Sequence, residues 1–513
     1  MWIATAQDIR AIDRCAVEHH CVPTRVLMER AGTAVFHAVR ELAPHHGRIG
    51  VVCGKGNNGG DGFVVARLAK RKGYDVYCAV AAEENDLSQD ADEQMRTAVA
   101  EGVSPVFCND PRFARMKDCL SNCDVVVDAL LGTGIQGEVQ GHVKGAIHAI
   151  NQSGAPVVSV DVPSGLHTDT GEELGESVWA ARTVTFGLPK PYLFQGIGVD
   201  HAGYWTVDDL GLPYELLAEP RDAKLLEGTW IGNVLPERMK ASHKGQHGSV
   251  LIVAGSRNMP GAAVLAAKGA LRAGAGLVTV AGVPNVCQAV AMQVPEALCL
   301  VLPDEDGVVS PSGAEAVLGR MERTDAALFG PGLTHEDAAM RFLESVWQGW
   351  TRPAVIDADA LNSVSLGVAP PRAPMVMTPH PGEMSRLLQQ SIGEIQCDRF
   401  SSLREALERY GCTMLLKGAY SLVGEPGRPI LVNCTGNPGM ATGGMGDVLG
   451  GVVATLAAQE VEPYYAAAAG MFWHGLAGDV CASAIGTIGF TASEVADALP
   501  NARAKITTSC CPR

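Results

Sequence analysis

A glycine-rich stretch at residues 441–451 carries one carboxylate, Asp447, directly before apolar residues with helical spacing. Glycines before a helix let backbone N–H groups converge on an anion, and the helix dipole favours negative charge there. An acidic residue would repel a simple phosphate ligand, but it makes sense if Asp447 accepts a proton while the amides hold the charge. The alternative is that Asp447 caps the helix and the glycines form a tight turn. On this stretch alone the two interpretations have equal weight.

Polar residues also follow three strands that we expect in the first half of the chain. Buried strands at residues 49–53, 124–128 and 156–161 lead into glycine-rich loops. Because the carboxyl ends of parallel strands lie at one edge of a sheet, these polar residues should face one crevice. They are Asn57, Asn58, Asp61, Asp128, Asp161 and Ser164. The glycine spacing fits neither G-x-G-x-x-G nor a Walker loop, yet three such loops in register favour a binding site over ordinary turn chemistry.

Alternating helices and strands are expected to position these loops. Helical spacing begins near Ile9 and again at residues 24–42, and helices at 63–72 and 87–100 alternate with strands. The second half has strands beginning near 249, 274, 326, 353, 376 and 414, each followed by a polar or glycine-rich turn. Residues 208–228 lose this rhythm, so we place a linker there. The pattern predicts an α/β protein of two domains, 1–215 and 225–500, each with its own parallel sheet and ligand edge.

The composition argues against several functional classes. A net charge of −16 over 513 residues disfavours nucleic acid or an anionic membrane as the main partner. The chain has no apolar run long enough to span a membrane, and it does not start with a secretory signal pattern. Fifteen cysteines are scattered without paired C-x-x-C spacing, as expected for reduced thiols in a cytoplasmic protein.

The first half resembles a known family, the NAD(P)HX epimerase domain, where NAD(P)HX denotes hydrated NAD(P)H. The matching motifs are GNNGGDG at 56–62, DALLGTG at 128–134 and DVPSG at 161–165. The resemblance implies a Rossmann-like three-layer sandwich and potassium coordination by Asn58, Asp128 and Ser164, whose oxygen ligands suit a hard cation. It also implies substrate contacts from Asn57, Asn58, Gly59, Gly60, Asp61, Gly132, Thr133, Gly134, Ile135, Gln136, Gly137, Glu138 and Asp161.

Asp161 is the candidate acid–base group for the reaction that this resemblance implies. C6 of the hydrated ring bears a hydroxyl beside the ring nitrogen. It can therefore lose the elements of water to give an iminium-like species and regain them on the other face. Such a step needs a positioned general acid or base. The alternative is that Asp161 is a loop-capping carboxylate.

The second half resembles the ADP- or ATP-dependent NAD(P)HX dehydratases, which have a ribokinase-like fold. The matching motifs are SHKG at 242–245, TPHPGE at 378–383, LKG at 416–418 and GNPGMATGGMGDVL at 436–449. The resemblance implies adenine-nucleotide contacts from Lys417, Gly418, Ala419, Tyr420, Ser421 and Gly446. It also implies a hydrated-cofactor site lined by Ala262, Gly332, His380 and Asp447. Taken alone, His380 would more often be a structural histidine, but beside the rest of the motif the interpretation as a ligand-binding residue is favoured.

Together the two resemblances imply a metabolite-repair enzyme that acts on NADHX and NADPHX. The first domain would interconvert the R and S epimers. The second would phosphorylate the C6 hydroxyl of the S form with ADP or ATP and then eliminate phosphate, with Asp447 as base. Mg²⁺ should accompany the nucleotide, and Glu383 and Asp357 are the carboxylates to test first. We also expect a homo-oligomer, although the small-residue helix at 262–270 could pack within the domain or between subunits.

Two alternatives stay open at this point. The second domain could be a vitamin kinase, since ribokinase-like kinases share the glycine–aspartate signature, but this does not explain the first domain. The first domain could instead be a non-catalytic binding or scaffold module. Its intact set of polar residues argues against that reading, because a scaffold has no need to keep them together. The residues do not decide between ADP and ATP, or between NADHX and NADPHX.

Overall fold

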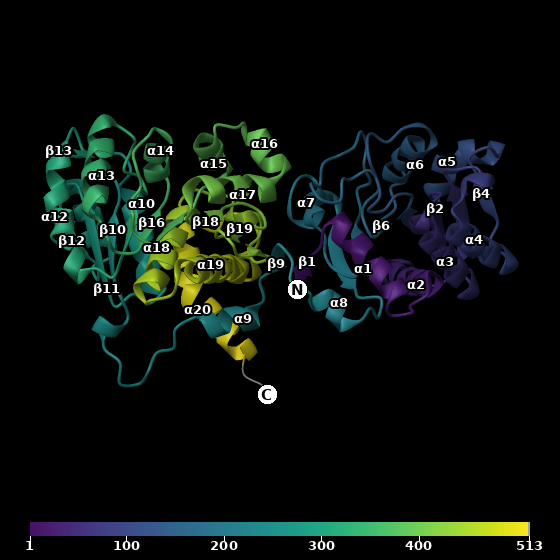
Figure 1. The fold of residues 1–513 in the computed structure, drawn as a ribbon, viewed down its shortest axis with the longest axis horizontal. Coiled ribbons are helices and arrows are strands. Elements are labelled where there is room, and N and C mark those ends of the chain that lie inside the picture. Colours follow the sequence, from purple (N-terminus) through teal and green to yellow (C-terminus); the bar gives the residue numbers. More distant parts are fainter. Residues whose placement is uncertain (511–513) are drawn as a thin grey trace. The chain divides into compact units, whose positions relative to one another are not determined.

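The computed structural model describes residues 1–510, with side chains described up to residue 506. Contacts divide the chain into two compact units, Met1–Arg221 and the part from Asp222 onward, each built around its own β-sheet (Figure 1). Helices alternate with strands in both units. The predicted α/β class is therefore confirmed.

The first unit contains a seven-stranded sheet in which all strands run parallel. Its order is β4 (Pro105–Phe107), β3 (Asp75–Val80), β2 (Arg48–Cys53), β5 (Val125–Ala129), β6 (Val157–Val160), β7 (Arg182–Phe186) and β8 (Tyr204–Asp208). The chain builds outward in one direction from β2 and in the other from β5. Ligands of open α/β sheets bind at such a switch point, outside the carboxyl ends of the strands. The three loops predicted to share a crevice follow β2, β5 and β6, which are adjacent.

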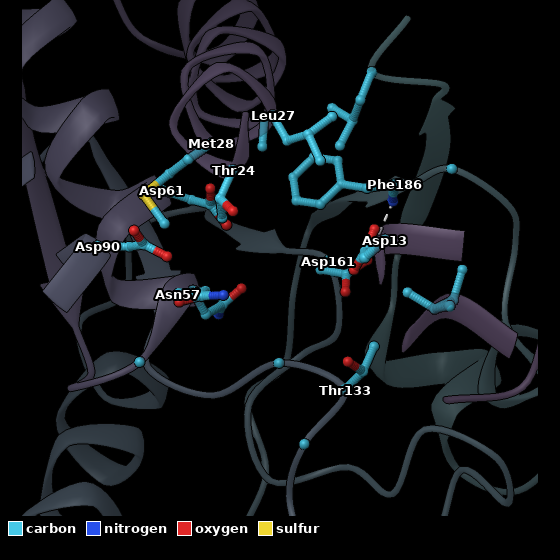
Figure 2. Close-up of a pocket in the computed structure, with 18 of the residues that line it drawn as sticks. Asp13, Thr24, Leu27, Met28, Asn57, Asp61, Asp90, Thr133, Asp161 and Phe186 are labelled. Carbon is cyan, nitrogen blue, oxygen red and sulfur yellow. Dashed lines mark hydrogen bonds between the residues drawn. The ribbon is translucent and has the colours of Figure 1, made fainter. Parts of the chain in front are cut away.

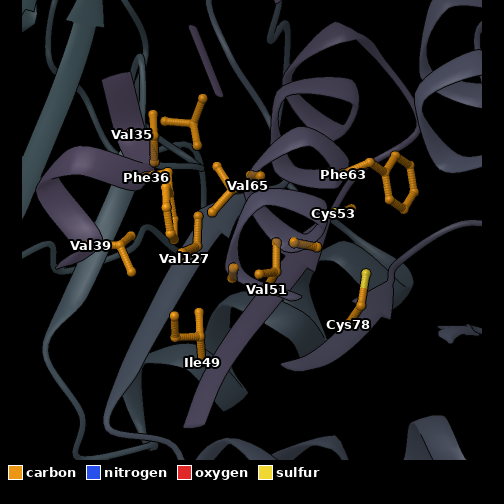
Figure 3. Packing of buried hydrophobic residues seen from close by; sticks show 14 of the residues in the cluster. Val35, Phe36, Val39, Ile49, Val51, Cys53, Phe63, Val65, Cys78 and Val127 are labelled. Atoms are coloured by element: carbon orange, nitrogen blue, oxygen red, sulfur yellow. The ribbon is translucent and has the colours of Figure 1, made fainter. Parts of the chain in front are cut away.

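Helices cover both faces of this sheet, as the alternation of buried residues requires. On β2, Val51 points into a core with Phe36 of α2 and Phe63 of α3 (Figure 3), whereas Val52 points into a second core with Leu120 of α5. The result is a three-layer sandwich. The helices are α1 (Ala6–Glu18), α2 (Thr24–Leu42), α3 (Asn57–Arg71), α4 (Gln89–Ala100), α5 (Met116–Leu120), α6 (Gly141–Asn151), α7 (Gly198–His201) and α8 (Tyr214–Ala218).

The glycine-rich segment after β2 differs from the prediction. We expected a loop up to residue 62, but α3 begins at Asn57. A Cβ atom at Gly59 would lie 2.0 Å from the carbonyl oxygen of Gly54, and one at Gly60 would also clash. Gly59 therefore allows the first turn of α3 to pack directly on the end of β2, and Gly60 allows it to pack on Met28 of α2.

The second unit has a mixed sheet whose central strands are parallel. Its order is β9 (Ala223–Leu225), β20 (Ile430–Val432), β19 (Leu422–Gly424), β18 (Thr413–Leu416), β17 (Met375–Met377), β16 (Ala354–Ile356), β15 (Ala326–Phe329), β10 (Ser249–Val253), β11 (Leu277–Gly282) and β12 (Leu298–Val301). β19 pairs antiparallel with β18 and β20, which the prediction of a parallel sheet did not include. The turn at 417–421 is too short for the crossover that parallel strands need.

Two helices of the second unit pack at backbone distance. A Cβ atom at Gly269 of α10 (Pro260–Arg272) would lie 2.4 Å from the carbonyl oxygen of Val448 in α18 (Met445–Ala458). The small residues of α10 therefore pack within the domain. The other main helices are α9 (Gly228–Val234), α11 (Pro284–Gln293), α12 (Ala314–Leu318), α13 (Asp337–Gly349), α14 (Asp359–Ser365), α15 (Pro381–Leu388), α16 (Ile392–Cys397), α17 (Arg399–Tyr410), α19 (Pro463–Ile485) and α20 (Ala492–Cys510).

Three further sequence expectations can be compared with the described residues. The segment expected as a linker, 208–228, includes the short helix α8 and the strand β9. None of the helices described is long and apolar enough to cross a membrane. The cysteines up to Cys481 are all free thiols. Cys510 and Cys511 lie outside the residues whose side chains are described.

Candidate active sites

A cavity of about 740 Å³ opens at the β2/β5 switch point of the first unit (Figure 2). Residues of α1, α2 and the segments after β2, β5 and β6 line it. The predicted contact residues in its lining are Asn57, Asn58, Asp61, Gly132, Thr133, Gly134, Ile135 and Asp161. Gly59 and Gly60 are buried in α3, while Gln136, Gly137 and Glu138 lie exposed further along the loop after β5.

Asp161 follows β6 with its backbone in the left-handed region, at φ 64°. Its Oδ1 atom accepts three hydrogen bonds, from Thr185 Oγ1 (3.0 Å), Phe186 N (3.1 Å) and Lys190 Nζ (2.5 Å). The hydroxyl of Tyr192 donates to the backbone carbonyl of Asp161 at 2.7 Å. One carboxylate oxygen is thus fixed by donors, which leaves Oδ2 for the cavity. A non-glycine residue held in this backbone region beside a cavity is typical of a functional position.

Lys190 is completely buried and was not predicted from the sequence. Its ammonium group uses all three of its donors, on Asp161 Oδ1, Thr185 Oγ1 (2.8 Å) and the carbonyl oxygen of Phe186 (2.8 Å). A lysine is almost never fully buried without a partner. The signal available in the sequence was therefore this cation within the apolar, proline-flanked segment GLPKP.

The other carboxyl groups that line the same cavity include Asp13 of α1 and Asp61 of α3. Burial, together with the charges of Asp161 and Asp13, raises the pKa of Asp61 well above its usual range. The Asp13 side chain is exposed to solvent at the cavity. Partial desolvation by the surrounding protein and the charge of Asp161 raise its pKa to about 6, although Lys190 opposes the shift. Asp13 was not among the predicted site residues.

The three side chains implied as potassium ligands meet around Leu131. Asn58 Nδ2 donates to the carbonyl oxygen of Leu131 (2.9 Å), whose own N–H donates to Ser164 Oγ (2.9 Å). Ser164 Oγ donates in turn to Asp128 Oδ1 at 2.6 Å. Burial raises the pKa of Asp128, and its hydrogen bonds with Ser164 oppose this shift. The group presents amide, carboxylate, hydroxyl and carbonyl oxygens, which fit a hard cation such as potassium by donor chemistry.

In the second unit, Lys417 brings several of the predicted residues together. Its Nζ lies 2.6 Å from Asp357 Oδ1 and 3.7 Å from Glu383 Oε2. A Cβ atom at Gly446 would lie 3.4 Å from the same Nζ. Burial lowers the pKa of Lys417, but Asp357 and Glu383 more than offset this, so the pKa is raised and the group is an ammonium. The ends of β16, β17 and β18 and the start of α18 therefore form one site.

Asp447 stands at this site without a hydrogen bond that would cap α18. The helix begins after Gly444 in the left-handed region (φ 87°), and no side chain caps it. Burial raises the pKa of Asp447 to about 7; Asp357 adds to the shift and Lys417 opposes it. A carboxylate with a pKa near neutrality can act as a general base at the pH of a cell. The structure thus favours the proton-accepting interpretation of Asp447 over the capping one.

His380 caps a helix, which is the role that the sequence motif made the less favoured of the two interpretations. It is the N-cap of α15, where its Nδ1 accepts from the backbone N–H groups of Gly382 (2.9 Å) and Glu383 (3.3 Å). Its Nε2 lies 3.4 Å from Glu383 Oε1, and half of the side chain is exposed. Two other residues predicted to contact the substrate, Ala262 and Gly332, are neighbours in the structure, because a Cβ atom added at Gly332 would lie 3.0 Å from the Cβ atom of Ala262.

The turn predicted to hold the nucleotide is fixed from both sides. Ser421 Oγ donates to the carbonyl oxygen of Gly418 (2.8 Å) and accepts from its N–H (3.2 Å). The buried guanidinium of Arg399 donates to the carbonyl oxygens of Leu416 (3.3 Å) and Lys417 (3.2 Å). Arg399 was not predicted from the sequence. It holds the start of the turn through these two backbone carbonyl groups.

Glu383 and Asp357 supply hard oxygen ligands suited to Mg²⁺. Among the described residues, no group of three or more His, Cys, Asp or Glu side chains could hold a metal ion. These two carboxylates would therefore need nucleotide phosphate and water to complete a magnesium site, which is the usual arrangement for nucleotide-bound magnesium.

Comparison with known proteins gives matches to both units. A family model described as NAD(P)H-hydrate dehydratase matches residues 250–501, and one described as YjeF-related protein N-terminus matches residues 24–192. Among solved structures, the ADP/ATP-dependent NAD(P)H-hydrate dehydratase from Bacillus subtilis, co-crystallised with ATP/Mg²⁺, is 27% identical with a TM-score of 0.50. That match covers 56% of this chain and 100% of the other.

Curated relatives match the chain over nearly its whole length. The bifunctional NAD(P)H-hydrate repair enzyme Nnr of Moorella thermoacetica is 38% identical over 510 residues, which cover 98% of this chain and 96% of that protein. The enzyme of the same name from Escherichia coli is 35% identical over 490 residues, with 96% and 92% covered. Since these matches include both units and both sites, the chain belongs to the family of bifunctional NAD(P)H-hydrate repair enzymes.

Proposed function

We propose that the two units divide the repair of hydrated NADH and NADPH between them. The first unit interconverts the R and S epimers of NAD(P)HX. The second dehydrates the S form to NAD(P)H at the expense of ADP or ATP, giving AMP or ADP and phosphate. The observation that carries this proposal is that each unit has its own aspartate and an ion-paired lysine at the carboxyl edge of its own sheet, in a chain that matches bifunctional repair enzymes over nearly its whole length.

In the first unit, Asp161 acts as acid–base catalyst on the C6 hydroxyl. Its Oδ1 is held by three donors, so Oδ2 faces the substrate. The ring nitrogen supplies electrons as the C6–O bond breaks, and water adds to the iminium-like species that results. The substrate is held by the residues of the predicted set that line the cavity, with Gln136, Gly137 and Glu138 meeting its outer part.

In the second unit, Asp447 removes the proton of the C6 hydroxyl as that oxygen attacks the terminal phosphorus of the nucleotide. Phosphate then leaves C6 with the bonding electrons, a proton is lost from the neighbouring carbon C5 to solvent, and the C5–H electrons form the ring double bond. Backbone amides at 443–446 stabilise the phosphoryl charge. Lys417, the turn at 418–421 and Gly446 bind the nucleotide, while Ala262, Gly332 and His380 line the site of the hydrated cofactor.

Two metal ions belong to this proposal. Asn58, Asp128 and Ser164 would hold K⁺, which supplies positive charge beside the cavity of the first unit. Asp357 and Glu383 would hold Mg²⁺ with the nucleotide, where it neutralises phosphate charge. The oxygen donors around Leu131, and the two carboxylates beside Lys417, support these assignments.

The test is recovery of NADH absorbance from each purified epimer of hydrated NADH. With ADP or ATP present, the S form should recover fast, and the R form should recover far faster than its spontaneous epimerisation allows. Without nucleotide neither should recover. Failure of the S form to recover with either nucleotide would overturn the proposal for the second unit. A cytoplasmic location and a homo-oligomer stay predictions.

A further inference from the structure

Asp13 has no role in the mechanism above, although it projects into the cavity of the first unit. It lies on α1, five residues before the end of that helix, whereas Asp161 follows β6. Figure 2 shows the two side chains close together on one side of the cavity, with Asn57, Asp61 and Asp90 on the other side. The two carboxyl groups therefore reach the same space from two separate elements.

The hydrogen bonding of the two groups is opposite in kind. Asp161 Oδ1 accepts from three donors, one of them the fully buried ammonium of Lys190. None of the hydrogen bonds between described residues ends on the Asp13 carboxyl, which is open to the cavity and lies near the charge of Asp161. Donors favour the ionised form of a carboxyl group, and a nearby like charge favours the protonated form. The structure thus has a fixed carboxylate beside a carboxyl group that can hold a proton.

We propose that Asp13 is a second catalytic residue of epimerisation, the acid that works together with the base Asp161. The Asp13 carboxyl gives its proton to the C6 hydroxyl, the C6–O bond breaks, and water leaves as the ring-nitrogen lone pair forms the iminium. A water molecule then adds to the opposite face of C6, which inverts that centre, and the proton of this water passes to Asp161. In the reverse direction the two groups exchange roles. This inference rests on the proposed epimerase function of the first unit.

The charged surroundings of Asp13 determine the expected pH dependence. The other ionisable groups that line the cavity are Arg14 and Glu18 of α1, Lys55 after β2, Asp61 of α3, Asp90 of α4 and Asp161 after β6, and Lys190 lies behind Asp161. Since partial desolvation and Asp161 raise the pKa of Asp13 to about 6, an acid at this position loses its proton as the pH rises above that value. Epimerisation should therefore slow on the alkaline side.

The test is steady-state epimerisation of R-NADHX, followed by chiral separation of the epimers, in the full-length protein. D13N should lower kcat by about 10²-fold with little change in KM, and it should remove the alkaline limb of the pH profile. D13E should restore part of kcat and keep that limb. Dehydration of S-NADHX should be unchanged in both. Glu93→Gln on α4, an exposed site with the same loss of charge, is the matched control and should epimerise normally.

Two results would overturn the proposal. One is a D13N enzyme with kcat within threefold of wild type, and the other is one that keeps the alkaline limb. If D13N is inactive, circular dichroism and the D13E enzyme separate loss of the acid from loss of the fold. An inactive but folded D13E enzyme without partial rescue would also count against the acid role. The Asp161→Asn variant separates failure of the proposed epimerase function from failure of the Asp13 proposal. If Asp161→Asn epimerises normally, the proposed function of the first unit fails. If D13N is normal and Asp161→Asn is inactive, only the role of Asp13 is rejected.

Discussion

Both active sites contain an aspartate that we assign to proton transfer and an ion-paired lysine, but the lysine has a different partner in each. In the first unit the buried Lys190 binds the catalytic Asp161 itself, through Oδ1 at 2.5 Å. In the second, the partly buried Lys417 binds Asp357 at 2.6 Å, and no lysine of the described residues pairs with Asp447. The same residue types therefore produce one carboxylate fixed as an acceptor and one whose pKa rises to about 7.

This difference matches the chemistry asked of each group. Asp447 must take a proton from an alcohol. A base whose pKa lies near the working pH is best suited to this, because it is largely ionised and is still basic enough to accept the proton. Asp161 acts on a reversible exchange of water, where a partner that holds the second proton is required. The neighbours of each aspartate, and not the aspartate itself, determine which role it takes.

The largest effect expected is that of Asp447→Asn. Because the amide cannot accept the proton of the C6 hydroxyl, dehydration of S-NADHX should fall by about 10³-fold. Epimerisation should be unchanged, because that cavity lies wholly in the first unit. Single-turnover dehydration and direct nucleotide binding check this. Loss of nucleotide binding would point to a structural role for Asp447.

Lys190→Met and Lys417→Met should affect different reactions. Lys190→Met leaves the carboxylate of Asp161 without its cation, which should destabilise the first unit by about 3–5 kcal/mol and lower epimerisation by about 10²-fold. Dehydration should persist in the fraction that stays folded. Lys417→Met should do the reverse, with dehydration lost and epimerisation kept.

Lys144→Met, at an exposed position of α6, is the matched control for these lysine variants. It should leave both activities and the denaturant midpoint near those of wild type. An equal loss of stability in Lys144→Met and Lys190→Met would show that the Lys190–Asp161 pair has no special importance.

The pH dependence of dehydration should follow the ionisation of the Asp447 carboxyl group in the second unit. Since burial raises the pKa of Asp447 to about 7 and the base is active when ionised, the rate should fall as the pH drops below 7. The expected slope is about tenfold per pH unit. Nucleotide-saturated kcat measured from pH 5 to pH 9, on the order of ten points, gives the profile. A flat profile across pH 6–8 would contradict the assignment of Asp447 as base.

The smallest effects concern the two glycine-rich segments, which differ in how closely they pack against the rest of the protein. Gly59→Ala places a Cβ atom 2.0 Å from the Gly54 carbonyl oxygen and should cost the first unit about 1–3 kcal/mol. Gly443 has open space around its Cβ position, so Gly443→Ala should change stability by no more than about 0.5 kcal/mol. Chemical denaturation compares the two. Equal costs would mean that both segments serve packing alone.

Much of the architecture follows from local patterns in the sequence. The strand–turn alternation predicted the α/β class, and the motifs led to the family that the whole-length matches confirm. Those matches favour a repair enzyme over both the vitamin-kinase alternative and the scaffold alternative. The start of α3 was missed because glycines read as loop formers, whereas here they remove Cβ atoms where a helix packs on a strand end.

The site residues that the sequence did not reveal act through long-range contacts. Lys190 reaches Asp161 from 29 positions away in the chain, and Arg399 reaches the turn after β18 from a separate helix. Asp13 is an ordinary polar residue of an amphipathic helix until the fold brings α1 against the cavity. No spacing rule connects such pairs, because their proximity arises only when the sheet is assembled.

The most direct test of the division of labour is to assay Asp161→Asn and Asp447→Asn side by side with each separated epimer of NADHX and ADP or ATP. We expect that Asp161→Asn dehydrates the S form normally but leaves the R form at its spontaneous rate. Asp447→Asn should epimerise both forms and dehydrate neither. If either variant lost both activities while it stayed folded, the assignment of one reaction to each unit would be wrong.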